Sequence, residues 1–305
     1  MIMVGCCGFP TSMKKYFENF SLVELNSTFY QYPRIETVEG WRVKAPQNFE
    51  FTVKVHRDIS HRAKLKVEAS SLQAFEHVKQ ICEILKTQIL LFQTPSSFRP
   101  DQLKDAEKFF RTVDRDGLVL VWETRGSAWE TLKVRKKLGE VLEKLNVVHV
   151  TDPFRLMPAY VGEIAYFRLH GLGKQMYYYQ YSDVELRKLK ELVVPYAKKS
   201  KDVYVFFNNL SMFEDALRFM RYLAEGTFPK IPSATGLASI REIVEKTRYP
   251  ITRNMLIRRL GWRLVKIREE EQAALETFLK NLPSRTYRDV EELIKEIKSV
   301  NRLSD

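Results

Sequence analysis

The sequence predicts an α/β fold: a (β/α)8 TIM-type barrel followed by an all-helical C-terminal extension. Eight short apolar runs recur along the first part of the chain, and helical patterns fill most of the gaps between them. A doubly wound open sheet is the alternative. That fold would need a glycine-rich phosphate loop after an early strand, and neither GxGxxG nor GxxxxGK[ST] occurs in the chain.

The eight apolar runs are rich in Val, Ile, Leu and aromatic residues, which is typical of strands buried on both faces. Each run ends in a polar residue or a turn signal. The expected strands cover residues 1–6, 21–29, 49–56, 88–95, 117–125, 146–153, 165–171 and 202–209.

Five of the intervening segments carry apolar residues at helical spacing, and the links after the first, second and sixth strands are less regular. Ser182, with Glu185 three residues later, predicts a capping box at the start of the fourth helix. The expected helices cover 67–86, 101–113, 131–145, 182–199 and 211–223.

Pro229 and Pro232 mark the predicted end of the barrel. We therefore expect two domains, a barrel over residues 1–230 and a basic helical extension over 231–305. The pattern of residues 233–305 predicts a series of helices without strands.

The composition is that of a folded chain, with 45% apolar residues and a net charge of +12. The charge favours an anionic partner, first of all DNA or RNA, although solvated basic helix faces would explain it as well. No apolar run approaches the roughly 20 residues of a membrane span. Three cysteines without a disulfide-like or zinc-like spacing indicate a cytoplasmic protein. The oligomeric state is left open.

Polar residues collect at the carboxyl ends of the predicted strands. Strand side chains alternate, so in AYFRLHG Tyr166, Arg168 and His170 share one face. In a barrel these ends line the mouth, where barrel enzymes keep their sites. The predicted ring consists of Glu24, Asn26, Lys54, His56, Gln93, Glu123, Arg125, Asp152, Arg168, His170 and Asn208.

Such a ring could support chemistry without a metal. Lys54, Arg125 and Arg168 could hold a phosphate or carboxylate. Glu24 or Glu123 could act as general base and His170 as general acid. Lys54 could also form a Schiff base if burial lowers its pKa. The alternative is an ion-pair network in which Glu24, Lys54, Glu123 and Arg168 neutralise one another and keep the barrel folded.

The C-terminal part contains a second basic feature. Residues 246–268 hold eight Lys or Arg residues and no acidic residue. A helix near 252–260 followed by Gly261 is loosely similar to a helix-turn-helix unit. We expect Arg253, Arg258, Arg259 and Arg263 to bind nucleic acid. The alternative is a helical cap with a solvated basic face.

Four tyrosines occur in YYYQYSD, residues 177–183, after the seventh predicted strand. Their rings could stack on bases or sugars. Alternatively they close over the barrel or pack on a neighbouring loop.

Several blocks of the chain resemble a known family. The runs ELNSTFYQYP, KVHRDISH, LLFQTPSSF, VWETRGSAW, YFRLHG and VYVFFNN are similar to successive blocks of the domain of unknown function 72 family, also called YecE-like. The resemblance covers roughly residues 4–226 and implies a TIM-type barrel. It implies the same polar positions at the strand ends, except His56, and adds His61. The family's barrel has been likened to endonuclease IV-type nucleases, which is an analogy of fold.

Nucleases of that type need clustered His and carboxylate ligands for several divalent ions. His56, His61 and His170 are available here with Glu24, Glu123 and Asp152. This set could hold one divalent metal but is too small for a three-zinc cluster. We assign no residue as a metal ligand, and we expect strand-end solvation for His56.

These observations lead to a ranked expectation. The first hypothesis is a barrel enzyme that acts on nucleic acid, by phosphodiester or damaged-base chemistry at the barrel mouth. The alternatives are an enzyme for a small phosphorylated or sugar-like metabolite and a non-catalytic nucleic-acid-binding barrel. The expected catalytic residues are Glu24, Lys54, Glu123 and His170. The expected substrate-binding residues are Asn26, His61, Gln93, Arg125, Asp152, Arg168 and Asn208.

Overall fold

The computed structural model describes residues 1–199, 202–229, 234–268 and 271–301. Contacts divide the chain into two compact units. The barrel unit comprises Met1–Leu169, Lys188–Asn208 and Met212–Met220. The C-terminal unit comprises the described residues of 170–187, 209–211 and 221–305. The predicted domain boundary at residue 230 falls next to residues outside the described ranges and stays a prediction.

The barrel unit is built on an eight-stranded sheet in the order β6-β5-β4-β3-β2-β1-β8-β7, with all neighbours parallel. A parallel bridge between Thr151 and Phe167 joins the two edges after β6. The predicted (β/α)8 class is confirmed, and the open-sheet alternative is wrong. The strands are β1 (Ile2–Cys7), β2 (Leu22–Leu25), β3 (Glu50–Lys54), β4 (Ile89–Gln93), β5 (Val119–Glu123), β6 (Val147–Val150), β7 (Ile164–Leu169) and β8 (Asp202–Phe207).

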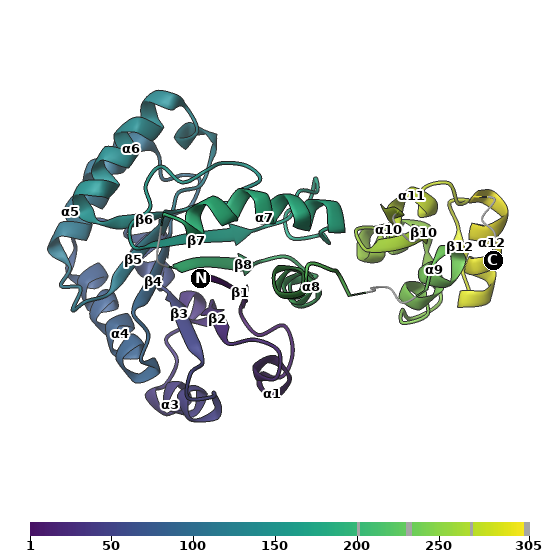
Figure 1. Cartoon of the computed structure of the whole chain (residues 1–305), viewed down its shortest axis with the longest axis horizontal. Coiled ribbons are helices and arrows are strands. Elements are labelled where there is room, and N and C mark those ends of the chain that lie inside the picture. The colour runs from purple at the N-terminus through teal and green to yellow at the C-terminus, as the bar shows by residue number, and fades with distance from the viewer. Residues whose placement is uncertain (200–201, 230–233, 269–270, 302–305) are drawn as a thin grey trace. The chain divides into compact units, whose positions relative to one another are not determined.

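Helices cover the outer face of the strands (Figure 1). The strands are buried because of this cover and because apolar side chains fill much of the barrel interior. The interior cluster includes Leu91, Val121, Val148 and Phe206. The five expected helices are α4 (Ala69–Leu85), α5 (Leu103–Thr112), α6 (Leu132–Leu145), α7 (Asp183–Ala197) and α8 (Met212–Glu225).

Local sequence signals explain several element ends. The predicted capping box is present, because Ser182 N donates to Glu185 at 2.8 Å and Glu185 N donates back to Ser182 Oγ at 3.3 Å. The irregular links hold α1 (Met13–Phe17), α2 (Ser27–Tyr30) and α3 (Ile35–Lys44). They also hold a π-helical turn at Asp58–Arg62 and 3-10 turns at Pro100–Gln102 and Ser127–Trp129.

The C-terminal unit contains the helices that the sequence predicts, but also strands that it does not. The helices are α9 (Gly236–Val244), α10 (Arg253–Leu260), α11 (Glu276–Leu279) and α12 (Val290–Asn301). The antiparallel strand pairs are β10 (Leu264–Arg268) with β11 (Glu271–Ala274) and β9 (Ile251–Thr252) with β12 (Thr286–Tyr287).

The prediction of an all-helical extension is therefore wrong in this respect. Apolar and basic side chains alternate in VKIR, residues 265–268, which is the strand period, and Val265 is buried in this unit's own apolar core. A hairpin follows α10, so the loose similarity to a helix-turn-helix does not hold.

The cysteines are free and buried. Burial raises the pKa of the Cys6 and Cys7 thiols. Within the described residues, no helix is both long enough and apolar enough to cross a membrane.

Candidate functional site

Arg168 on β7 is the centre of a buried polar cluster inside the barrel. Its Nη2 and Nε donate to the two oxygens of Glu24, at 2.8 and 3.0 Å. Its Nη1 donates to Gln93 Oε1 at 3.1 Å and contacts Glu123 Oε2. Arg168 is only 1% exposed. We call Glu24, Lys54, Gln93, Glu123 and Arg168 the Arg168 cluster.

The carboxylate of Glu24 is held from several sides. Asn26 Nδ2 donates to Oε1 at 2.9 Å, and the Tyr166 hydroxyl donates to Oε2 at 2.7 Å. Since that hydroxyl has a single proton, it accepts from Thr52 Oγ1, which lies 2.9 Å away. Tyr166 and Thr52 were not among the predicted site residues. Tyr166 lies two residues before Arg168 on the same strand, so both side chains point to one face. This alternation could have identified Tyr166 as a site residue.

The charges of the cluster are largely balanced. Burial acts to lower the pKa of Arg168, but the neighbouring carboxylates of Glu24 and Glu123 outweigh it and hold that pKa well above its ordinary value. Arg125 Nε donates to Glu123 Oε1 at 2.8 Å. The ion-pair network expected as an alternative therefore exists for the two glutamates and Arg168, while their catalytic roles stay predictions.

Lys54 belongs to the cluster but not to the ion-pair network. Its Nζ donates to Gln93 Oε1 at 2.7 Å and lies 4.2 Å from the centre of the Phe29 ring. Among the residues that the structure describes, no carboxylate lies within ion-pairing distance of this nitrogen. Burial, together with the charge of Arg168, lowers the pKa of Lys54 to about 7. Lys54 is only 6% exposed, so solvent offsets little of the cost of burying its charge.

We expect Lys54→Met to stabilise the fold, most strongly below pH 7. Folding lowers the pKa of Lys54, so the unfolded chain binds more protons between about pH 7 and 10, and the cost of burying this lysine falls as the pH rises. Gln93 keeps its bond to Arg168 in the variant. Urea unfolding at pH 6 should show a gain of at least about 1.4 kcal/mol, the equivalent of one pKa unit. The gain should shrink towards pH 10, and an equal gain at both pH values would contradict the assignment.

His61 lies in the π-helical turn beside the cluster. Its ring packs edge-on against Phe29 with centroids 4.8 Å apart. Burial and the charges of Lys54 and Arg125 lower its pKa to about 4, so it is neutral at pH 7. It can therefore accept a proton, or coordinate through a ring nitrogen, but it is a poor acid at that pH.

Two predicted residues lie at strand ends with local contacts. Asp152 Oδ1 accepts from Phe154 N at 3.1 Å, which shapes the turn after β6. Asn208 follows β8, and its backbone N donates to Leu169 O at 2.8 Å. The expected solvation of His56 is wrong, because the residue is buried: its ring stacks on Tyr32 with centroids 3.9 Å apart, and its Nδ1 accepts from Asp58 N at 3.2 Å.

His170 belongs to the C-terminal unit, so its position relative to the Arg168 cluster is not described. Its ring lies 5.9 Å from that of Tyr177. The tyrosine loop packs partly on neighbouring segments of the same unit, because the Tyr181 hydroxyl accepts from Gly171 N at 2.8 Å and Asn209 Nδ2 donates to Tyr179 O at 2.8 Å.

The predicted nucleic-acid-binding residues lie on α10 and just after it. Arg258 and Arg259 are exposed. Arg253 is half-buried and donates to Leu282 O at 2.9 Å, and Arg263 lies 5.6 Å from the Trp262 ring. Lys266, in the same basic run, is buried. The basic run is thus not one continuous exposed face.

The two glutamates of the Arg168 cluster are poorly suited to hold a divalent metal. Among the described residues, no three His, Cys, Asp or Glu side chains are grouped to hold one. Glu24 and Glu123 each bind Arg168, whose charge would oppose a dication at those oxygens.

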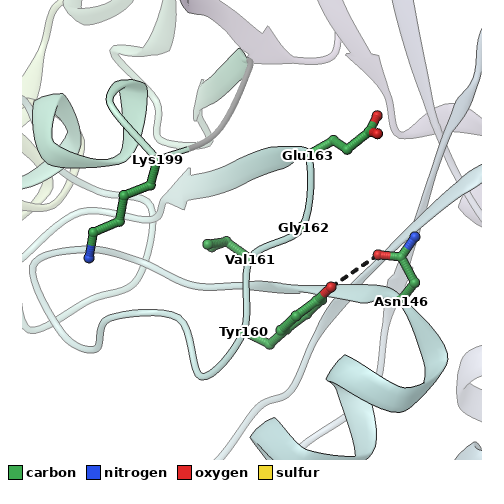
Figure 2. Close-up of a pocket in the computed structure, with 6 residues that line it drawn as sticks. All are labelled: Asn146, Tyr160, Val161, Gly162, Glu163 and Lys199. Carbon is green, nitrogen blue, oxygen red and sulfur yellow. Dashed lines mark hydrogen bonds between the residues drawn. The ribbon is translucent and has the colours of Figure 1, made fainter.

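A cavity of about 590 Å³ opens elsewhere on the barrel unit (Figure 2). Its lining comes from segments that precede β6, β7 and β8, which places it at the amino ends of those strands. The Tyr160 hydroxyl donates to Asn146 Oδ1 at 3.1 Å across it. Because barrel chemistry belongs to the opposite face, we assign this cavity no role.

The parallel sheet, joined at its edges, defines a TIM-type barrel, and the polar cluster lies at the carboxyl ends of its strands. The chain belongs to the family described as protein of unknown function DUF72, whose model matches residues 8–235. The predicted family is thereby confirmed.

Relatives and solved structures agree with this assignment. The UPF0759 protein YunF of Bacillus subtilis is 24% identical over 230 residues, 65% of this chain and 80% of that protein. The UPF0759 protein YecE of Escherichia coli is 39% identical over 56 residues, 18% of this chain and 21% of that protein. A DUF72 family protein of Thermotoga maritima has a TM-score of 0.60 at 26% identity, covering 74% of this chain and 100% of that one. One from Enterococcus faecalis has a TM-score of 0.59 at 25% identity, covering 73% and 97%.

Proposed function

We propose that this protein is a barrel enzyme that acts on nucleic acid at a damaged nucleotide whose sugar carries an aldehyde, with Lys54 as the nucleophile. The observation that carries the proposal is the setting of the Lys54 amine. It is buried beside Arg168, held by Gln93, and has no counter-charge within ion-pairing distance among the described residues. A lysine in such surroundings is available as a neutral amine near pH 7.

The chemistry follows from that amine. Its lone pair attacks the carbonyl carbon, the carbonyl oxygen takes up the two protons that the nitrogen loses, and departure of that oxygen as water leaves an imine between substrate and Lys54. Of the two reactions expected from the sequence, damaged-nucleotide chemistry is favoured over phosphodiester hydrolysis. The reason is that Glu24 and Glu123, which would serve as bases in the latter, are both engaged by Arg168.

The net charge of +12 and the exposed arginines of α10 support nucleic acid as the partner. At the barrel mouth, the side chain of Arg125 is 22% exposed, and its planar guanidinium could meet a phosphate while it stays paired with Glu123.

Borohydride trapping tests the proposal. The protein is incubated at pH 7 with an oligonucleotide that contains one abasic site, and borohydride reduces any imine to a stable amine. We expect a covalent adduct that peptide mass spectrometry places on Lys54, and we expect Lys54→Arg to abolish it. Lys79→Arg is the matched control, because Lys79 is also buried but is ion-paired with Asp116 at 2.7 Å. An adduct that survives in Lys54→Arg would overturn the assignment of the nucleophile.

Burial of the cluster favours a second candidate, an enzyme for a small phosphorylated or sugar-like carbonyl compound. Glu24 is fully buried and Lys54 nearly so, which suits a small substrate as well as a nucleotide turned out of its strand. The same trapping with a panel of sugar phosphates separates the two. An adduct on Lys54 with a sugar phosphate but not with abasic DNA would favour the small-metabolite enzyme.

A further inference from the structure

A cavity of about 750 Å³ lies within the C-terminal unit. One wall is the loop that precedes α7, and the other is formed by α10, the β10–β11 hairpin and α11. Small-molecule sites typically have volumes of roughly 300–1,000 Å³. The function proposed for Lys54 makes no use of this cavity.

Hydrogen bonds join the two walls. Leu264 N donates to Oε1 of the buried Gln180 at 2.9 Å. Asp183 N donates to Gln272 Oε1 at 3.1 Å, and Gln272 Nε2 donates back to Asp183 Oδ2 at 3.4 Å. The cavity is therefore bounded by segments that hold one another in place, as a preformed binding site requires.

Aromatic rings line the cavity from both walls. Trp262 is half-buried, and its Nε1 donates to Arg259 O at 2.9 Å, which fixes the indole at the end of α10. Tyr178 is also half-buried, and its hydroxyl has no hydrogen-bond partner among the described residues. Each ring offers a flat apolar surface on which a base could stack.

The unpaired charge at the cavity is positive. The side chains of Arg258 and Lys174 are exposed. Among the residues that the structure describes, neither side chain makes a hydrogen bond or an ion pair. The carboxylates at the cavity are already engaged. Glu276 pairs with Lys280 at 2.6 Å, and Glu185 accepts from Ser182 N at 2.8 Å and from the Tyr179 hydroxyl. Within the described part of the chain, an anionic ligand would thus find two free cations and no free carboxylate lining this cavity.

We propose that this cavity binds a nucleotide, with the base against Trp262 and the phosphate held by Arg258 and Lys174. The proposal rests on the proposed function only for the source of the nucleotide, which we take to be a single-stranded nucleic acid chain. A free nucleotide would offer the same chemistry.

Binding of AMP and of a short single-stranded oligonucleotide to the full chain tests the site, by calorimetry at low salt. We expect both to bind, the oligonucleotide more tightly, and Arg258→Ala to weaken AMP binding about tenfold, as loss of a charge-assisted hydrogen bond does. Arg248→Ala is the matched control, since it removes the same charge from an exposed position of the same unit that does not line the cavity. Its AMP affinity should stay within about twofold of the unmodified protein. Trp262→Leu should weaken both ligands about tenfold, because the base would no longer stack on an indole.

Equal affinity for AMP and the oligonucleotide would support the site and identify the free nucleotide as its ligand. The proposal is overturned if neither ligand binds, or if Arg258→Ala and Arg248→Ala have the same AMP affinity. Arg258 is exposed, so its variant is expected to fold. The result is independent of Lys54. If trapping failed while AMP still bound, only the proposed function would be contradicted. If trapping succeeded while AMP did not bind, only this site would be contradicted.

Discussion

Replacing Arg168 with Met should cost about 3–5 kcal/mol of unfolding free energy at pH 7, the expected loss when one partner of a buried ion pair is removed. Arg168 is 1% exposed and binds both Glu24 and Glu123, so the variant leaves Glu24 buried without a cation and Glu123 paired with Arg125 alone. Protonation removes those charges, so the deficit relative to the unmodified protein should shrink as the pH falls towards about 4. Urea unfolding at pH 7 and pH 4 measures both effects.

Arg125→Met is the control for Arg168→Met. Arg125 pairs with the same Glu123 at 2.8 Å, but its side chain is 22% exposed, so we expect a cost of about 1 kcal/mol or less. Adding Glu24→Gln to Arg168→Met should recover part of the lost stability, because one buried charge disappears. If Arg168→Met cost no more than Arg125→Met at pH 7, the ion-pair network would not be what keeps the polar barrel folded.

Affinity for duplex DNA should fall steeply with salt, with a slope near −0.9 per phosphate contacted, because each neutralised phosphate releases counterions. Changing Arg258, Arg259 and Arg263 together to Ala should flatten that slope by about one unit for each phosphate that these arginines no longer neutralise. Fluorescence anisotropy across a salt series measures it. For a protein that contacts many phosphates, the rise in salt concentration lowers the affinity by several powers of ten.

The charge-matched control removes three lysines from α6 of the barrel unit, Lys133, Lys136 and Lys137, which are exposed. It lowers the net charge equally and should change the slope little. An equal change in both triple variants would mean that only overall charge attracts nucleic acid. If the intact protein bound no DNA or RNA at low salt, nucleic acid would be excluded as partner, and the small-metabolite enzyme would take its place.

Sequence patterns predicted those features of this protein that depend on neighbouring residues along the chain. Apolar runs such as ILLFQ predicted the barrel strands, because a strand buried on both faces must be apolar along its length. Alternation along the seventh strand predicted that Tyr166 and Arg168 point to the same face. The hydrogen bonds that both side chains donate to Glu24 agree with this prediction. The C-terminal hairpin was missed, because the alternation in VKIR is only four residues long and lies within a basic run that also suits a solvated helix face.

What the sequence by itself determined is the barrel and the set of polar residues at its strand ends. Which of those residues pair was decided only by the tertiary structure. Glu24, Glu123 and Arg168 are far apart along the chain, and only closure of the sheet places both carboxylates on one guanidinium. Once both carboxylates bind Arg168, neither pairs with Lys54, which is left with an amide partner and a lowered pKa. The protonation of a buried lysine depends on distances across the barrel, and no pattern along the chain encodes those distances.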